Sequence, residues 1–139
     1  MSEESEQDQN FIDGWPMNTP LDIRMGLTKE EGINHPLRWG IISASAIASD
    51  WIKSLQDVPG ASTVAIAASD LDRAKAYAEA HGIDKAYDDY EALCQDPDVD
   101  IVYIASKTWN HHRDLMTAIE AGKHVLCEKP FTHKAEQAR

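Results

Sequence analysis

Long apolar runs and basic side chains are scarce in this chain of 139 residues. No apolar run approaches the roughly 20 residues that a membrane-spanning helix requires, so the sequence predicts no membrane association. Lys and Arg together number 13 against 24 Asp and Glu, which gives a formal charge of −11. This charge disfavours nucleic acid and anionic lipid as partners. The length and the hydrophobic content of 42% suffice for one globular domain with a sizeable core.

Cysteine is also rare, with Cys94 and Cys127 the only two. They fit neither a metal-site spacing nor a disulfide framework, so we expect free thiols in a reducing compartment and a cytoplasmic protein. The acidic start and the lack of an apolar stretch after it argue against a secretory or mitochondrial signal. No metal site is expected either. The neighbours His111 and His112 would point about 100° apart on a helix, with no further ligand at suitable spacing.

Residues 1–36 are predicted to form an acidic extension. Residues 1–10 are polar and should be disordered. Residues 11–36 contain apolar side chains without clear periodicity, interrupted by three prolines. They could lie across the domain, form a mobile linker, or bind a partner.

From residue 37 onward, short apolar runs alternate with helical patterns. Continuous apolar runs are typical of strands buried on both faces of a parallel sheet. The predicted strands cover residues 39–42, 63–68, 85–87, 101–105 and 124–127. The predicted helices cover residues 47–56, about 70–81, a short stretch capped by Asp88, 111–121, and a last one capped by Thr132. The second of these should be capped by Ser69 and end at Gly82, with Leu71, Ala74 and Ala78 buried. This alternation predicts an α/β domain with a doubly wound parallel sheet, the Rossmann dinucleotide-binding architecture, over residues 37–139.

The turn after the first predicted strand lacks glycine. In a dinucleotide-binding unit this turn reads G-x-G-x-x-G/A, and its backbone N–H groups approach a pyrophosphate at a helix N-terminus. Here it reads Ser43-Ala44-Ser45-Ala46-Ile47-Ala48. The Ser45 hydroxyl could cap the helix or donate to a phosphate oxygen, whereas its Cβ would hinder close approach. The sequence leaves two alternatives open. Either the turn still binds the cofactor, through Ser43, Ser45, Ala46 and Ile47, or it no longer does.

The loop after the second predicted strand bears on the choice between NAD and NADP. An acidic side chain there would bind the ribose of NAD, and an Arg would accept the extra phosphate of NADP. Ser69 stands at this position, and Asp70 is more simply a helix-end charge. Arg73 lies one turn further and could swing across. The cofactor is therefore predicted to be NADP or NAD.

Two more loops should reach the same edge of the sheet, because ligands bind at the carboxyl ends of parallel strands. Residues 106–111 follow the fourth predicted strand, and residues 128–130 follow the fifth. Lys129 is the candidate catalytic residue, since a cation there can orient a substrate oxygen and stabilise alkoxide charge. The alternative is an ordinary surface lysine, and Glu128 is equally ambiguous. The Lys129–Pro130 bond could be cis.

Several segments resemble the N-terminal domain of the Gfo/Idh/MocA oxidoreductases. They are Leu-Arg-Trp-Gly-Ile-Ile-Ser at 37–43, Asp-Leu-Asp-Arg-Ala-Lys-Ala at 70–76, Tyr-Glu-Ala-Leu at 90–93, Asp-Pro-Asp-Val-Asp-Ile-Val-Tyr-Ile-Ala at 96–105 and Ala-Gly-Lys-His-Val-Leu-Cys-Glu-Lys-Pro at 121–130. The Glu-Lys-Pro tripeptide is the family's signature. The opening segment is most similar to NADP-linked sugar and diol dehydrogenases.

The resemblance implies hydride transfer at a hydroxyl or carbonyl carbon of a sugar or cyclic diol. It implies that Lys129 contacts substrate and cofactor, and that His111 corresponds to the family's histidine in the loop that here begins Ser106-Lys107-Thr108. We therefore count Ser106, Thr108, His111 and Glu128 with Ser69 and Arg73 as candidate cofactor contacts.

Three departures from the family pattern bear on function. Ser45 replaces a glycine, and Ser69 stands where NADP-linked members often have Arg. The second domain, which supplies the substrate pocket and the oligomer interface in the family, would lie beyond Arg139. The alternative hypothesis is a non-catalytic Rossmann module that serves as a binding or regulatory protein.

Overall fold

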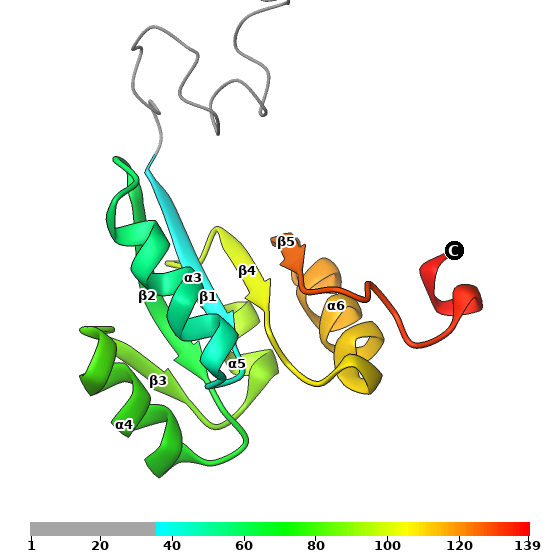
Figure 1. The fold of residues 1–139 in the computed structure, drawn as a ribbon, viewed down its shortest axis with the longest axis horizontal. Coiled ribbons are helices and arrows are strands. Elements are labelled where there is room, and N and C mark those ends of the chain that lie inside the picture. Colours follow the sequence, from blue (N-terminus) through cyan, green and yellow to red (C-terminus); the bar gives the residue numbers. More distant parts are fainter. Residues whose placement is uncertain (1–35) are drawn as a thin grey trace, which may run out of the picture. The chain divides into compact units, whose positions relative to one another are not determined.

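The computed structural model describes residues 36–139, which form a parallel five-stranded sheet with helices on both faces (Figure 1). The strand order is β3-β2-β1-β4-β5. The strands are β1 (Leu37–Ile42), β2 (Ala61–Ala67), β3 (Lys85–Tyr87), β4 (Ile101–Ile104) and β5 (His124–Cys127). The helices are α3 (Ala46–Gln56), α4 (Leu71–His81), α5 (Tyr90–Gln95), α6 (His111–Glu120) and the short 3-10 helices η1 (Thr108–Asn110) and η2 (Ala135–Ala138). The predictions made for residues 1–35 lie outside the described residues.

The continuous apolar runs divide their side chains between two cores. Ile41 lies in the core that α3 and α4 cover, and its neighbour Ile42 lies in the core that α5 and α6 cover. Tyr103 and Val102 are divided in the same way. Successive side chains of a strand point to opposite faces, so a strand covered on both faces needs apolar residues at every position. The predicted doubly wound parallel fold is confirmed.

Several predicted boundaries and caps are wrong by one or two residues. Asp70, rather than Ser69, is the N-cap of α4, and its carboxylate accepts from the Arg73 N–H at 2.9 Å. Asp89, rather than Asp88, caps α5. Serine and aspartate cap helices about equally well, so the sequence alone could not choose between neighbours. The Ala68 N–H donates to the Tyr87 carbonyl at 3.0 Å, so the chain is still bonded to β3 just before α4 begins.

Two smaller predictions also need correction. Leu71 is only half-buried, whereas Ala74 and Ala78 are buried as predicted. Thr132 does not cap a helix, because its hydroxyl donates to the Lys134 carbonyl and the short η2 begins at Ala135.

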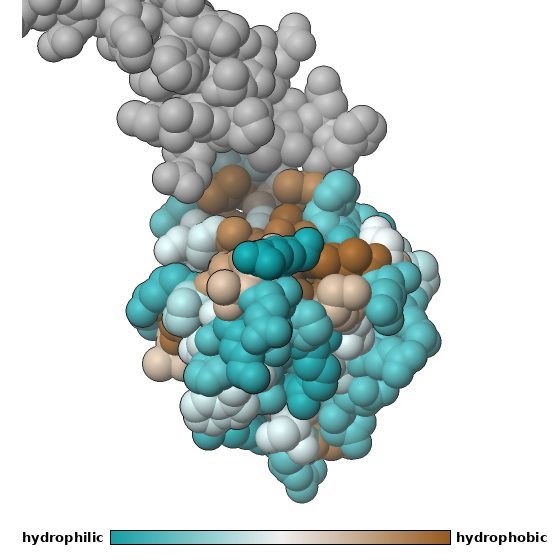
Figure 2. Space-filling view, turned by 90° about the vertical axis from the view of Figure 1, so that its right-hand side faces the viewer, coloured by the Kyte–Doolittle hydropathy of each residue, from teal (hydrophilic) through white to brown (hydrophobic). Residues whose placement is uncertain are grey.

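Strand β5 is an edge strand, paired with β4 on one side within residues 36–139. The face of the molecule on this side shows apolar surface within a hydrophilic surround (Figure 2). Leu126 on β5 and Ile119 on α6 are among the exposed large apolar side chains, 37% and 54% exposed.

Among the described helices, none has the length and apolar character needed to span a bilayer.

A network of charged side chains ties the amino ends of the strands together. The Arg38 guanidinium donates to both carboxylate oxygens of Asp100, at 3.0 and 2.8 Å. The backbone N–H of Arg38 also donates to Asp100, at 2.9 Å. These bonds hold the pKa of Asp100 at about 2, against the ordinary 3.8. The pair thus links β1 to the loop before β4, on the edge opposite the candidate site.

This network predicts how stability depends on pH. Because the pKa of Asp100 is lower in the folded chain than in the unfolded chain, its contribution is fully present above about pH 4 and is lost as pH falls through about 2. Asp100→Asn should therefore lower the unfolding midpoint in urea near neutral pH and flatten its fall across this window. Asp84→Asn, at an exposed carboxylate, should follow the wild type. Parallel curves for wild type and Asp100→Asn between pH 2 and pH 4 would contradict this assignment.

Candidate cofactor-binding site

The loops predicted to form the site meet at the carboxyl edge of the sheet. The Ser43 N–H donates to the Ala67 carbonyl at 2.9 Å, which joins the first loop to the end of β2. The Ser45 hydroxyl donates to the Ala105 carbonyl at 3.1 Å, which joins the first loop to the end of β4. The loops after β4 and β5 are joined through His111. Segments far apart in sequence therefore line one edge.

The glycine-less turn keeps a Rossmann geometry with serines in it. Ser43 has φ of 85°, a conformation that costs a residue with a side chain roughly 1–3 kcal/mol. Ser45 has an ordinary extended backbone, with φ of −117°, and is the N-cap of α3. Its hydroxyl accepts from the Ala48 N–H at 3.4 Å. The Ser45 hydroxyl was predicted to cap the helix or to donate to a phosphate oxygen. In the structure it caps α3, and its proton is donated to the Ala105 carbonyl.

Two backbone donors remain open at this turn. The N–H groups of Ala46 and Ile47 begin α3 and have no acceptor within residues 36–139. Unpaired N–H groups at a helix N-terminus favour an anion. Both residues are exposed, so this end of α3 faces solvent. The turn therefore offers donors to a phosphate, although the Ser45 side chain stands beside them.

Arg73 reaches back from α4 to the turn. Its guanidinium Nη2 donates to the Ala44 carbonyl at 2.7 Å. The carboxylate of Asp70 is used as the cap of α4, in agreement with its interpretation as a helix-end charge. Arg73, predicted as able to swing across, therefore lies between the end of β2 and the first turn, where the ribose of a dinucleotide would lie.

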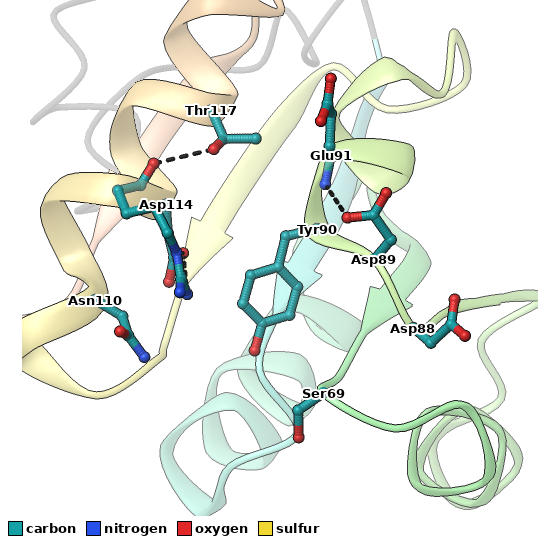
Figure 3. Close-up of a pocket in the computed structure, with 9 residues that line it drawn as sticks. Ser69, Asp88, Asp89, Tyr90, Glu91, Asn110, Asp114 and Thr117 are labelled. Atoms are coloured by element: carbon teal, nitrogen blue, oxygen red, sulfur yellow. Dashed lines mark hydrogen bonds and ion pairs between the residues drawn. The ribbon is translucent and has the colours of Figure 1, made fainter.

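Next to this edge, a pocket of about 470 Å³ lies between α5 and α6 (Figure 3). The Tyr90 ring stands at its centre, with Asn110 and Asp114 on one side and Asp88 and Asp89 on the other. The lining residues are Ser69, Asp88, Asp89, Tyr90, Glu91, Asn110, Arg113, Asp114 and Thr117. The pocket is an open hollow with polar and acidic side chains around the Tyr90 ring.

The structure adds residues that the sequence reasoning missed. Tyr90 lies just after β3, and its pKa is raised chiefly by burial. The Arg113 guanidinium lies 5.8 Å from the centre of the Tyr90 ring, close enough for a cation–π contact. Asp88–Tyr90 follow β3, so the tendency of ligands to bind at the carboxyl ends of parallel strands is the sequence signal that points to them.

The His111 side chain connects the loop after β4 to the loop after β5. Its side chain is 1% exposed. Its ring nitrogens lie 2.9 Å from the Ser106 and Pro130 carbonyls. A ring enclosed in this way holds two loops together and presents no free nitrogen to a ligand. The predicted contact between His111 and a cofactor stays a prediction.

The first turn of α6 contains a buried carboxylate. Asp114 is 1% exposed and accepts from the Ser106 hydroxyl at 2.6 Å and from Arg113 at 2.7 Å. The Ser106 hydroxyl, another predicted cofactor contact, therefore gives its proton to Asp114. Thr108 begins η1 and is half-buried, and nothing in the structure ties its hydroxyl to the site.

In the loop after β5, Glu128 and Lys129 differ in their surroundings. Glu128 accepts from the Tyr103 hydroxyl at 2.7 Å, and burial together with this carboxylate raises the pKa of Tyr103. Glu128 is thus tied to β4. Lys129 is exposed, its ammonium has no ion pair within the described residues, and its bond to Pro130 is cis, as suggested from the sequence. No group of three His, Cys, Asp or Glu side chains is arranged for a metal ion within residues 36–139.

Comparison with known proteins gives a consistent picture. A family described as "Oxidoreductase family, NAD-binding Rossmann fold" matches residues 37–139. The trans-1,2-dihydrobenzene-1,2-diol dehydrogenases of Bos taurus and Homo sapiens are each 46% identical over 105 residues. These matches cover 74% of this chain and 31% of each relative. The chain thus spans about a third of the length of these relatives.

Solved structures agree with the sequence relatives. A 3-ketoreductase from Actinomadura kijaniata, KijD10, in complex with NADP is 37% identical, with a TM-score of 0.70, over 75% of this chain and 33% of that chain. An NAD-binding oxidoreductase from Klebsiella pneumoniae is 34% identical, with a TM-score of 0.70, over 73% of this chain and 29% of that chain.

Proposed function

Because this chain belongs to the Gfo/Idh/MocA oxidoreductase family and contains its NAD-binding Rossmann domain, we propose that residues 37–139 bind the cofactor of an oxidoreductase that acts on a sugar or cyclic diol. When bound, the cofactor supplies the hydride donor or acceptor for a carbon bearing a carbonyl or a hydroxyl. The diol dehydrogenases and the 3-ketoreductase among the relatives support this substrate class. The second domain of the family would complete the substrate pocket.

The single observation that carries this proposal is the pair of open N–H groups at Ala46 and Ile47. They lie at the N-terminus of α3, where a Rossmann unit holds the pyrophosphate. The residues present fit that group, because Ser45 needs no positive φ and its hydroxyl is turned toward Ala105. We assign the donors of this turn to the pyrophosphate.

We assign the adenosine half to the pocket beside Tyr90, and we propose NADP as the preferred cofactor. The carboxylate that follows Ser69 in the loop after β2, that of Asp70, is held as the cap of α4. Arg73, one turn into α4, reaches the Ala44 carbonyl of the first turn and can pair with a 2′-phosphate. A cation and a hydroxyl at this position favour the phosphorylated ribose over the free one.

Lys129 is proposed as the catalytic residue. It is exposed at the carboxyl end of β5, and Glu128 beside it is held by Tyr103. The ammonium can bind the oxygen of the reacting carbon and stabilise the alkoxide charge that develops there. His111 holds the following residue, Pro130, through its carbonyl, which fixes the position of this loop.

A non-catalytic Rossmann module remains the second candidate, favoured by the Ser45 side chain beside the open donors. Titration of the chain with NADPH and NADH, followed by tryptophan fluorescence, separates the two. We expect a saturable signal with NADPH, and a weaker affinity for NADH. No saturable signal with either cofactor at millimolar concentration would overturn the cofactor-binding proposal.

Arg73→Ala tests the preference for NADP. Loss of a charge-assisted contact to the 2′-phosphate should weaken NADPH binding by about 10- to 100-fold. NADH binding should weaken far less, because NADH lacks that phosphate. The dissociation constants from the same fluorescence titration give the ratio. Lys75→Ala removes an exposed cation from the same helix and serves as the control, and an unchanged NADPH-to-NADH ratio in Arg73→Ala would contradict this assignment.

A further inference from the structure

Helix α4 contacts the nucleotide turn with two side chains. Arg73 and Tyr77 lie four residues apart, on one face of the helix. Arg73 donates to the Ala44 carbonyl at 2.7 Å, and the Tyr77 hydroxyl donates to the Ser45 carbonyl at 2.9 Å. Two consecutive carbonyls of the turn are therefore held from outside the turn.

The Tyr77 hydroxyl is itself held in place. It lies 2.8 Å from the Ser49 hydroxyl, which lies 3.0 Å from Nε2 of His81. The Tyr77 and His81 rings also pack against each other, with centroids 4.5 Å apart and planes tilted by 45°. Burial raises the pKa of Tyr77, so the hydroxyl keeps its proton near neutral pH. The donor to the Ser45 carbonyl is thus fixed by contacts on both helices.

The geometry of the peptide bond connects this contact to the cofactor site. The Ser45 carbonyl and the Ala46 N–H belong to one planar trans peptide unit and point in opposite directions. The Ser45 carbonyl also accepts the Ser49 N–H at 3.1 Å, the first bond of α3, and the Ser49 hydroxyl at 3.4 Å, and this orientation points the Ala46 N–H toward the open end of α3. Tyr77 adds a donor from α4 that holds this peptide unit from outside its own helix. A donor on the carbonyl also polarises the unit and strengthens its N–H as a donor.

We propose that Tyr77 is a positioning residue for the cofactor, which aims the Ala46 N–H at the pyrophosphate by holding the Ser45 carbonyl. The inference rests on the proposed cofactor function. A turn with Ser43 and Ser45 in place of glycines has less conformational freedom to adapt to a pyrophosphate. Tyr77 instead holds this turn in position from α4. Arg73 and Tyr77 then have separate effects, the first on the 2′-phosphate and the second on the pyrophosphate.

Tyr77→Phe removes the hydroxyl and leaves the ring that packs against His81. We expect it to weaken NADPH, NADH and ADP by the same factor, about three- to tenfold, which is the range for one hydrogen bond. Adenosine 2′-monophosphate, which lacks a pyrophosphate, should bind unchanged. Calorimetric titrations of the full chain with the four ligands give these values. Equal weakening of all four ligands, or of none, would overturn the inference.

A second readout needs no cofactor. In the ¹⁵N-labelled chain, Tyr77→Phe should shift the Ala46 amide resonance, because the Ser45 carbonyl loses a donor. Ser54→Ala removes a hydroxyl on the same helix that donates to the Asp50 carbonyl, and it should leave this resonance unchanged. An Ala46 amide that behaves identically in wild type and Tyr77→Phe would sink the positioning role. If the wild type binds neither NADPH nor NADH, the proposed function fails, while the amide measurement still decides whether Tyr77 aims this peptide.

Discussion

Ser45→Asp is expected to lower the affinity for NADPH by at least about 100-fold while leaving the domain folded. A carboxylate at this position would stand beside the donors assigned to the pyrophosphate. Like charges about 4 Å apart near a protein surface repel by roughly 4 kcal/mol, and each 1.4 kcal/mol is tenfold in affinity. Aspartate is as good an N-cap as serine, so α3 should be retained. Fluorescence titration and the thermal midpoint measure the two effects.

Two neighbouring substitutions separate charge from size. Ser45→Asn keeps a capping side chain of the same shape as aspartate without its charge, and it should bind NADPH within about tenfold of the wild type. Ser45→Gly removes the side chain and should bind NADPH at least as tightly as the wild type. It should also melt at a lower temperature, because the bond to the Ala105 carbonyl is lost. Equal losses in the Asp and Asn variants would refute the electrostatic explanation.

Gly40→Ala is expected to destabilise the domain by about 1–3 kcal/mol, or roughly 5–15 °C in Tm. Gly40 lies in the central strand β1. A Cβ there would stand 2.8 Å from Leu93 Cδ2 and 2.9 Å from Val99 Cγ1. Both contacts are closer than carbon atoms can approach, and both side chains are buried in one core. The strand or α5 must therefore move. Urea unfolding with circular dichroism measures the loss.

A double-mutant cycle with Val99→Ala tests this cause. Removing the Val99 methyl groups makes room for the new Cβ, so Gly40→Ala should cost less in the Val99→Ala background than in the wild type. Gly122→Ala is a control with a different mechanism. Gly122 has φ of 74° and nothing within 4 Å of the added Cβ, so only backbone strain would be measured. Identical costs in the two backgrounds would show that crowding is not the reason.

The sheet could be predicted from the sequence because each strand carries its own signal. Runs such as Ile101–Ile104 are apolar at every position, and burial on both faces of a sheet demands this pattern. Helix starts were predicted less well. Ser69 and Asp70 are both capable caps, and the choice between them depends on the bond from the Ala68 N–H to Tyr87, a contact across the sheet.

The candidate site could be predicted as a place more easily than as a set of contacts. Parallel strands bring their carboxyl ends to one edge, so the position of Lys129 and of the serine turn followed from chain order. Which nitrogen or hydroxyl stays free depends on neighbours distant in sequence. His111 looked available, but carbonyls of two loops enclose its ring. The reach of Arg73 to Ala44 likewise spans 29 residues.

The two contacts from α4 also have a consequence for how such a turn can evolve. When a turn is shaped by its own glycines, its sequence is constrained at those positions. Here Arg73 and Tyr77 hold the carbonyls of Ala44 and Ser45, so part of what determines the conformation of the turn lies about thirty residues downstream in the sequence. The sequence of the loop can then change more freely, provided that the face of α4 that carries Arg73 and Tyr77 is retained. A search restricted to the loop would pass over a site of this kind, whereas a search that pairs the loop with that helix face would find it.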